Sequence, residues 1–449
     1  MKRIVSMAAL AAVAAGAAFA DLKTSLNVRM GGNVVSHTMK DDSDNNSTKV
    51  MDLGSSDFGC DGLTFKASND YAGLTLNWGT SLQTKENGKN QANLFWVSDG
   101  NGKGIEINAW LKPTDWLKFQ VGAHKDGIFT ADQVKKDTDD TNWSGAGKYA
   151  FLYKPGVITK ASTGYFLDAL TDVANGGQAY LFADFSFKDV GPGNLTIRPT
   201  FVSTGQDFFQ KKDKKDSDVT MKTAPGLLVL YKIDDLITVN LDFQMPTNQD
   251  IAAGLYVSPS IVENLQLMVG GTVATNLSDE TDKLGYKMNQ KWFGVKSESA
   301  ADFAAYGETY FAVDLRARYV AGDFHIANAF NYTGATGDNN VLKTTGTYGQ
   351  GNGQIWDSIF LTYKLNDSWT ITGNVQVDVL MGAKSKALNT AEDATILDLY
   401  VTPGVMYTVG KGATITCGVH VNFLDLTDGW DSKTGSTSIS VPFLFRVKM

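Results

Sequence analysis

The stretch Trp369-Thr-Ile-Thr-Gly-Asn-Val-Gln-Val-Asp-Val-Leu-Met381 decides the fold class, because apolar and polar residues alternate along it. The odd positions are apolar or small, and the even positions from Thr370 to Asp378 are polar. Successive side chains of a β-strand point to opposite faces, so this period of two predicts a strand with one apolar and one polar face. Ordinary strands have about 5 to 6 residues, whereas a tilted membrane-crossing strand needs about 9 to 11. The length of the stretch therefore favours a strand that crosses a membrane.

The same alternation recurs along the chain, at residues 237–245, 414–423 and 438–448. The polar positions of these segments are rich in Thr, Asn, Gln, Arg and Asp, while the apolar positions carry Ile, Val, Leu and Phe with almost no charge. A charge on a lipid-facing strand position costs about 2 to 4 kcal/mol at the middle of a bilayer. This pattern predicts polar faces that line a wet interior and apolar faces that contact lipid.

Composition excludes several other classes of protein. The 449 residues carry a formal net charge of −8, with four His and two Cys. An acidic chain lacks the basic face that nucleic-acid binding requires, and two Cys build neither a disulfide framework nor a four-ligand zinc site. The chain has no interior run of 18 apolar residues, so a helical membrane protein is also excluded. No cofactor and no metal site are expected, and no nucleic acid is expected as a partner.

The first twenty residues have the organisation of a secretory signal. Lys2 and Arg3 precede an apolar stretch that begins at Ile4 and ends in Ala18-Phe19-Ala20. A short apolar core followed by a small-x-small site is typical of a cleaved signal peptide. The sequence therefore predicts a signal peptide over residues 1–20 and one β-barrel domain over residues 21–449.

The connections between the expected strands fall into two length classes that alternate along the chain. Short turns rich in Asn, Asp and Gly include residues 69–73, 232–235 and 366–368, and longer polar segments include residues 40–49 and 334–353. Eight short turns and nine long segments give about eighteen strands, with sixteen as the alternative because two segments have ambiguous alternation. Aromatic residues lie beside the short turns, as expected for an interfacial ring: Tyr71, Trp116, Tyr319, Tyr363, Trp369 and Tyr407.

With a signal peptide, alternating strands, short turns, long loops and a terminal amphipathic strand, the chain resembles bacterial outer-membrane general porins. The resemblance implies an all-β fold, a transmembrane antiparallel up-and-down β-barrel with short periplasmic turns and long extracellular loops. It also implies location in the cell outer membrane, with outer-membrane lipid and small hydrophilic solutes or ions as partners and a homotrimer as a possible assembly.

The longest connection, residues 127–175, exceeds the usual loop length by far, which indicates a functional or structured loop. In general porins the third long loop folds into the barrel, and by that resemblance this loop is the candidate constriction. A solvated surface loop is the alternative. The candidate acidic contributors are Asp132, Asp137, Asp139, Asp140, Asp168 and Asp172.

Strand alternation also places charged residues on the polar faces, where they become candidates for lining a pore. Arginines opposite acids create a transverse field across a water-filled channel, and an excess of one sign biases ion selectivity. Ion pairs that only stiffen the wall are the alternative, as Asp314 and Arg316 illustrate two residues apart. The candidates are Arg29, Lys66, Glu106, Arg198, Asp242, Asp314, Arg316, Arg318, Asp378, Asp398 and Arg446.

These observations favour a porin that forms a water-filled channel for passive ion transport and diffusion of small hydrophilic solutes. The sequence shows no phosphate loop, zinc motif or catalytic carboxylate pair, so we do not expect an enzyme and assign no catalytic residue. The alternative is a non-catalytic surface barrel that acts as an adhesin or a structural outer-membrane protein.

Overall fold

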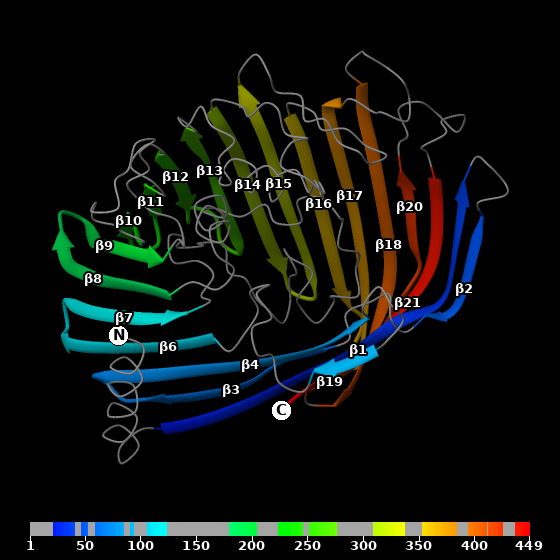
Figure 1. Ribbon diagram of the computed structural model, residues 1–449, viewed down its shortest axis with the longest axis horizontal. Coiled ribbons are helices and arrows are strands. Elements are labelled where there is room, and N and C mark those ends of the chain that lie inside the picture. The colour runs from blue at the N-terminus through cyan, green and yellow to red at the C-terminus, as the bar shows by residue number, and fades with distance from the viewer. Residues whose placement is uncertain are drawn as a thin grey trace, which may run out of the picture.

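A computed structural model describes the chain over residues 21–40, 46–52, 59–84, 90–93, 106–123, 179–203, 223–245, 251–275, 309–336, 353–383, 394–410, 412–424 and 436–449. The regular elements in these ranges are strands of one antiparallel sheet (Figure 1), which confirms the all-β prediction. Within the same ranges, no helix is long and apolar enough to cross a membrane. The predicted signal peptide and the candidate constriction loop, residues 127–175, lie outside the described residues.

In chain order, the strands have the following bounds: β1 Asp21–Lys40, β2 Ser47–Asp52, β3 Gly59–Ser68, β4 Ala72–Thr84, β5 Asn90–Asn93, β6 Glu106–Thr114, β7 Leu117–Ala123, β8 Ala179–Val190, β9 Gly193–Ser203, β10 Thr223–Ile233, β11 Ile237–Gln244, β12 Ile251–Pro259, β13 Leu265–Thr275, β14 Thr309–Ala321, β15 Phe324–Thr336, β16 Gly353–Lys364, β17 Trp369–Ala383, β18 Ala394–Gly410, β19 Ala413–Gly418, β20 His420–Leu424 and β21 Ser436–Lys448.

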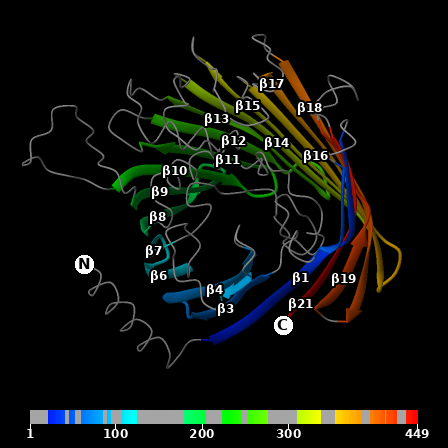
Figure 2. The same ribbon diagram turned by 45° about the vertical axis from the view of Figure 1, so that its right-hand side comes forward.

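Each strand from β6 to β18 pairs with the next strand along the chain, so the sheet grows as a meander. The sheet curves around a common interior, as the two views in Figures 1 and 2 show. The first and last strands lie side by side, because β1 pairs with β21 on one side and with β2 and β3 on the other.

The described residues form twenty-one strands, so the predicted counts of eighteen and sixteen are wrong. The difference arises where two short strands pair in succession with the same neighbour. β2 and β3 both pair with β1, β5 and β6 both pair with β4, and β19 and β20 both lie between β18 and β21. A count based on turns treats each such pair as one strand.

The faces of the sheet are inverted relative to a water-soluble protein. On β11 the polar residues Thr238, Asn240, Asp242 and Gln244 are buried, whereas Leu241 between them is 46% exposed. The same alternation holds on β17, where Thr370 and Thr372 are buried between exposed apolar neighbours. The predicted division into an enclosed polar face and an outer apolar face is therefore confirmed on β11 and β17.

The structure resolves the two segments whose alternation was ambiguous. On β10, Ala224 and Leu228 are buried, so this strand presents apolar residues to both sides. On β12, Tyr256 is buried and Leu255 is 52% exposed. The even-numbered positions face the interior on both strands, as they do on β11.

Short turns join the strands at one end of the sheet, near the predicted positions. Asn69 and Asn366 each cap a turn with the side-chain oxygen, which accepts backbone N–H bonds from the residues two and three positions ahead at 2.8 to 3.0 Å. Asx turns of this kind are the physical reason that Asn punctuates hairpins. Asp235 and Asn264 adopt positive φ angles of 57° and 62°, a conformation that Asp and Asn tolerate better than most residues.

Three of these turns carry a lysine–aspartate ion pair. Lys112 Nζ lies 2.8 Å from Asp115 Oδ1, and Lys364 Nζ lies 2.7 Å from Asp367 Oδ1. A third lysine, Lys232, lies 2.7 Å from Asp234 Oδ1. The hydrogen bond and charge of each lysine lower the pKa of Asp115 and Asp367 below the ordinary range. These three hairpins thus share one structural feature, a lysine–aspartate ion pair at the turn.

The aromatic residues predicted beside the short turns all lie on the outer surface. Trp369 packs against Tyr407 with ring centroids 4.7 Å apart, and Trp116 stacks on Phe185 at 6.3 Å. Aromatic rings with a polar tip suit the boundary between hydrocarbon and water. The exposed set consists of Tyr71, Trp116, Tyr319, Tyr363, Trp369 and Tyr407.

Candidate channel lining

Most of the predicted lining residues lie on the enclosed polar face of the sheet. Asp242, Asp314, Arg316, Arg318 and Arg446 are buried there, on β11, β14 and β21. This placement follows from the alternation, because each one sits between outward apolar neighbours. Their role as channel-lining groups remains a prediction.

The other candidates are placed here by strand register alone. Arg29 pairs in register with Arg446, Glu106 with Asn77, and Asp378 with Asp398. Of these, the side chains of Arg29, Glu106 and Asp378 lie outside the described part of the structure. Lys66 on β3 is exposed and lies in register with Thr75.

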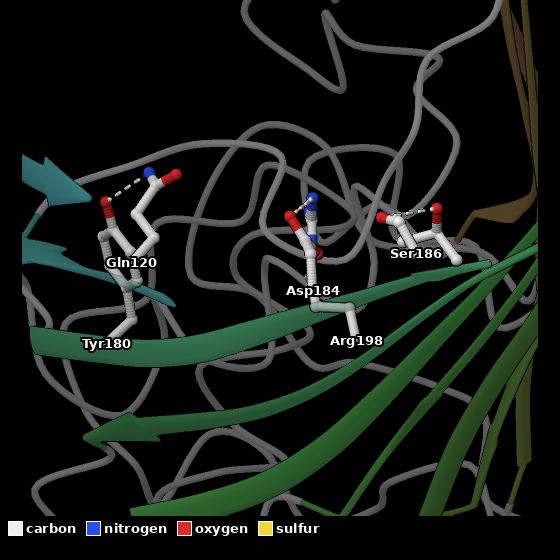
Figure 3. Close-up of polar contacts among 6 residues, drawn as sticks. Gln120, Tyr180, Asp184, Ser186 and Arg198 are labelled. Carbon is white, nitrogen blue, oxygen red and sulfur yellow. Dashed lines mark hydrogen bonds and ion pairs between the residues drawn. The ribbon is translucent and has the colours of Figure 1, made fainter. Parts of the chain in front are cut away.

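Arg198 on β9 forms an ion pair with Asp184 on β8. Its Nε lies 2.5 Å from Asp184 Oδ1, and its Nη2 lies 3.1 Å from Oδ2, so the pair is bidentate (Figure 3). The Arg198 guanidinium also lies over the Phe182 ring, 4.3 Å from its centroid. A fork-shaped guanidinium held by a carboxylate and an aromatic face has a fixed orientation.

Neighbouring side chains extend this pair into a cluster on the inner face of β6 to β9. Lys118 interacts electrostatically with both Asp184 and Arg198, and its Nζ lies 5.2 Å from the Trp110 ring centroid. Gln120 Nε2 donates to Tyr180 Oη at 3.2 Å, and Tyr180 stacks on Phe182 with centroids 5.7 Å apart. We call Trp110, Lys118, Gln120, Tyr180, Phe182, Asp184 and Arg198 the β6–β9 cluster; two cations and one anion give it a formal charge of +1.

A second group lies on the inner face of β12 to β14. The Tyr256 hydroxyl contacts Thr272 Oγ1 and donates to Asp314 Oδ2 at 3.3 Å. The ring of Tyr256 lies against Gly270, and a Cβ atom at that position would overlap ring carbons of Tyr256 and the carbonyl oxygen of Leu255. Gly270 therefore permits the close approach that aims the Tyr256 hydroxyl along the wall toward Asp314.

A third group joins β18 to β20. Tyr400 Oη donates to Asp398 Oδ2 at 3.3 Å, and the Tyr400 ring stacks on His420 with centroids 6.4 Å apart. Thr402 Oγ1 and His420 Nδ1 are 2.7 Å apart. Hydrogen bonds among wall residues such as these hold their side chains in defined orientations.

Sequence reasoning missed Asp184 and the inward aromatic residues Tyr180, Phe182, Tyr256 and Tyr400. Strand alternation could have identified Asp184, because it shares the even parity of Tyr180 and Ser186 on β8. Inward aromatic residues carry no such signal, since aromatic side chains are also common on lipid-facing positions. Among the described residues, no group of three or more His, Cys, Asp or Glu is placed to hold a metal ion.

Comparisons with solved structures give matches that span nearly the whole chain. OmpTdeltaL8, a loop L8 deletion mutant of OmpT and an outer membrane protein of Vibrio cholerae, is 13% identical, with coverage of 95% of this chain and 99% of that chain and a TM-score of 0.42. Pseudomonas aeruginosa OccK2 (OpdF) in complex with glucuronate is 9% identical, with coverage of 96% and 98% and a TM-score of 0.48. Pseudomonas aeruginosa OccK8 (OprE) is also 9% identical, with coverage of 96% and 98% and a TM-score of 0.45.

No protein-family model matches the sequence, and no curated protein matches it.

Proposed function

We propose that the chain is an outer-membrane porin whose sheet closes into a barrel around a water-filled channel. Small hydrophilic solutes and ions diffuse through it without an energy source and without a catalytic step. The short turns face the periplasm, and the longer connections face the cell exterior. A barrel of this size leaves an aqueous lumen.

Closure of the barrel is supported by the pairing of its first and last strands. β1 and β21 pair from Asn27 opposite Lys448 to Lys40 opposite Ser436. Beyond this ladder, Leu26 and Met449 exchange backbone hydrogen bonds of 2.7 and 2.8 Å.

The inversion of the two faces is the observation that carries the proposal. A water-soluble protein buries its apolar side chains and leaves few charged groups inside. Here Val375 is 42% exposed on β17 while its neighbours Asn374 and Gln376 are buried, and Asp314 and Arg316 are buried on β14. This arrangement is stable when lipid covers the outer face and water wets the inner one.

The charges of the inner wall support weak ion selectivity with a slight anion preference. In the β6–β9 cluster the Arg198 charge is balanced by Asp184, and Lys118 adds one positive charge. Charges in a channel act over short range at physiological salt, since the screening length is about 8 Å. The wall cations near the permeating ion therefore outweigh the net negative charge of the whole chain.

Cysteine modification during channel recording tests the proposal. In a Cys60→Ala/Cys417→Ala background, Ser186→Cys places a thiol on the inner face of β8, and Ala183→Cys places one on the outer face of the same strand. A positively charged methanethiosulfonate reagent should lower the single-channel conductance of Ser186→Cys and leave that of Ala183→Cys unchanged. A folded, membrane-inserted protein that conducts no ions would contradict the channel and favour the adhesin or structural barrel.

A further inference from the structure

The inner face of β17 to β20 carries buried polar atoms that no described residue hydrogen-bonds. Thr372 Oγ1 and Gln376 Nε2 lie on β17, Thr416 Oγ1 lies on β19, and Asn422 Oδ1 lies on β20. All four side chains are more than nine-tenths buried and share the inward parity of their strands. Buried polar groups are normally hydrogen-bonded, so four unpaired atoms on neighbouring strands indicate that this face takes a polar molecule from outside the chain.

Strand register places two of these side chains around a pair of glycines. β17 and β18 pair side by side (Figure 1), with Thr372 opposite Gly404, and Gly404 lies opposite Gly418 on β19. Thr416 precedes Gly418 by two residues on the same face. Both glycines are half-buried, whereas the two threonines are buried. Because glycine has no side chain, the wall between the two threonine hydroxyls consists of backbone alone.

The other two side chains lie further along the same strands. Gln376 and Asn422 both lie in register with Tyr400, one on each side of β18. Thr372 and Gln376 are four residues apart on β17, or about 13 Å at about 3.3 Å per residue. Two strand spacings of about 4.8 Å make the group about 10 Å wide. We call Thr372, Gln376, Gly404, Thr416, Gly418 and Asn422 the neutral patch.

The neutral patch carries no formal charge, in contrast to the β6–β9 cluster with its charge of +1. The inward positions of residues 370–376, 402–406 and 414–422 hold no Asp, Glu, Lys or Arg. The nearest charged residues border the patch: Asp398 lies two residues from Tyr400, and Arg446 lies in register with Thr414. A face without charge attracts ions of neither sign, so its polar atoms suit an uncharged solute.

We propose that the neutral patch binds an uncharged polyhydroxylated solute, a sugar or a polyol, inside the channel. The threonine hydroxyls donate and accept hydrogen bonds, Gln376 Nε2 only donates, and Asn422 Oδ1 only accepts. A solute hydroxyl also does both, so one class of solute pairs with all four atoms. The proposal rests on the proposed function, because a water-filled channel is what brings solute to this face.

Reduction of the single-channel current by sucrose tests the binding. In the wild-type protein, the current should fall with sucrose concentration along a saturating curve. Polyethylene glycol of the same hydrodynamic radius offers mainly ether oxygens, which only accept hydrogen bonds, and should lower the current in proportion to its concentration. A proportional decrease with sucrose as well would show that only water pairs with these atoms, and would overturn the proposal.

Variants of the two threonines test the site itself. Thr372→Val/Thr416→Val removes two hydroxyl groups with little change of shape, and should raise the half-saturating sucrose concentration about tenfold. Because these hydroxyls are unpaired in the chain, the variant should fold as well as the wild type. Thr372→Ser/Thr416→Ser keeps both hydroxyls and should retain the wild-type value. Thr238→Val, buried on the inner face of β11, is the matched control and should also retain it. Equal values for the wild type and the double valine variant would overturn the proposal.

Saturation-transfer difference NMR of sucrose, with the protein in lipid nanodiscs, measures binding without conduction. The wild-type protein should give sucrose signals that the double valine variant loses. This result in a protein that conducts no ions would contradict only the channel and support the patch. A conducting protein that gives no such signals would contradict only the patch.

Discussion

The energetic cost of an arginine on the outer face of β17 should depend on how far the position lies from the short turns. Val375 and Ile371 both point outward, and each is 42% exposed. Val375 is six residues from the interfacial Trp369, whereas Ile371 is two residues from it. At about 3.3 Å per residue and a tilt of about 40°, these spacings correspond to depths of roughly 15 Å and 5 Å.

The depth difference sets the magnitude of the expected effect. Val375→Arg should lower the free energy of unfolding by about 2 to 4 kcal/mol, and Ile371→Arg by about 0 to 1 kcal/mol. A difference of about 2 to 3 kcal/mol is roughly a 30- to 150-fold difference in the unfolding equilibrium constant. Gln376→Arg, next to Val375 on the inner face, should cost less than Val375→Arg because its side chain faces the lumen.

Reversible urea unfolding from phosphatidylcholine vesicles, followed by tryptophan fluorescence, measures these free energies. Equal costs for Val375→Arg and Ile371→Arg would show that exposure alone sets the cost, as expected for a face in water, and would refute the membrane assignment. A larger cost for Gln376→Arg than for Val375→Arg would show that the inner and outer faces have been exchanged.

Three further predictions follow from contacts on the inner wall and at the turns. Arg198→Gln leaves Asp184 without its partner and should shift the reversal potential in a salt gradient toward cations, whereas Asp184→Asn/Arg198→Gln should restore a value close to wild type. Gly270→Ala should destabilise the protein by about 1 to 3 kcal/mol because the new methyl group overlaps Tyr256, and Gly373→Ala, which has open space, should cost less in the same unfolding assay. Lys112→Met should raise the pKa of Asp115 toward its ordinary value. Because the ion pair lowers that pKa in the folded state, its contribution to the free energy of unfolding is present above the unfolded-state pKa and should disappear as the pH falls through the folded-state pKa. Urea unfolding of wild type and variant across the acidic range measures this loss.

The sequence predicts which face of a strand is enclosed wherever the two faces differ in polarity. On β17 every polar position from Thr370 to Gln376 is buried, because a period of two assigns each side chain to a face without reference to any partner. Polarity does not identify the enclosed face on β10 and β12, where Leu228 and Tyr256 face inward. An inner wall accepts apolar side chains where they pack on neighbouring strands, so apolar character alone does not identify the outer face.

The number of strands could not be read from turns alone. Val419 lies between β19 and β20, yet both strands continue along β18 and β21, and no hairpin marks the break. The two strands keep a single register along β18 and along β21, so the break interrupts the pairing without shifting it. Local sequence patterns contain the tight turns but not these interruptions.

The contacts that give the wall its chemistry depend on register, which a single strand does not encode. Alternation predicts that Arg198 faces inward, but its pairing with Asp184 requires β8 and β9 to be aligned through a ladder whose register shifts between Phe187 and Val190. A shift by one residue at that irregularity would bring a different residue of β8 beside the guanidinium and leave the carboxylate without this partner. The same dependence explains why Asp357 is an isolated exception in a strand pattern but half of a hydrogen-bonded pair in the sheet, because only the alignment of β15 with β16 brings Asn328 to it. Functional hypotheses for this wall must therefore be tested on pairs of residues, because the charge of a residue predicted from one strand is balanced by a residue of the neighbouring strand.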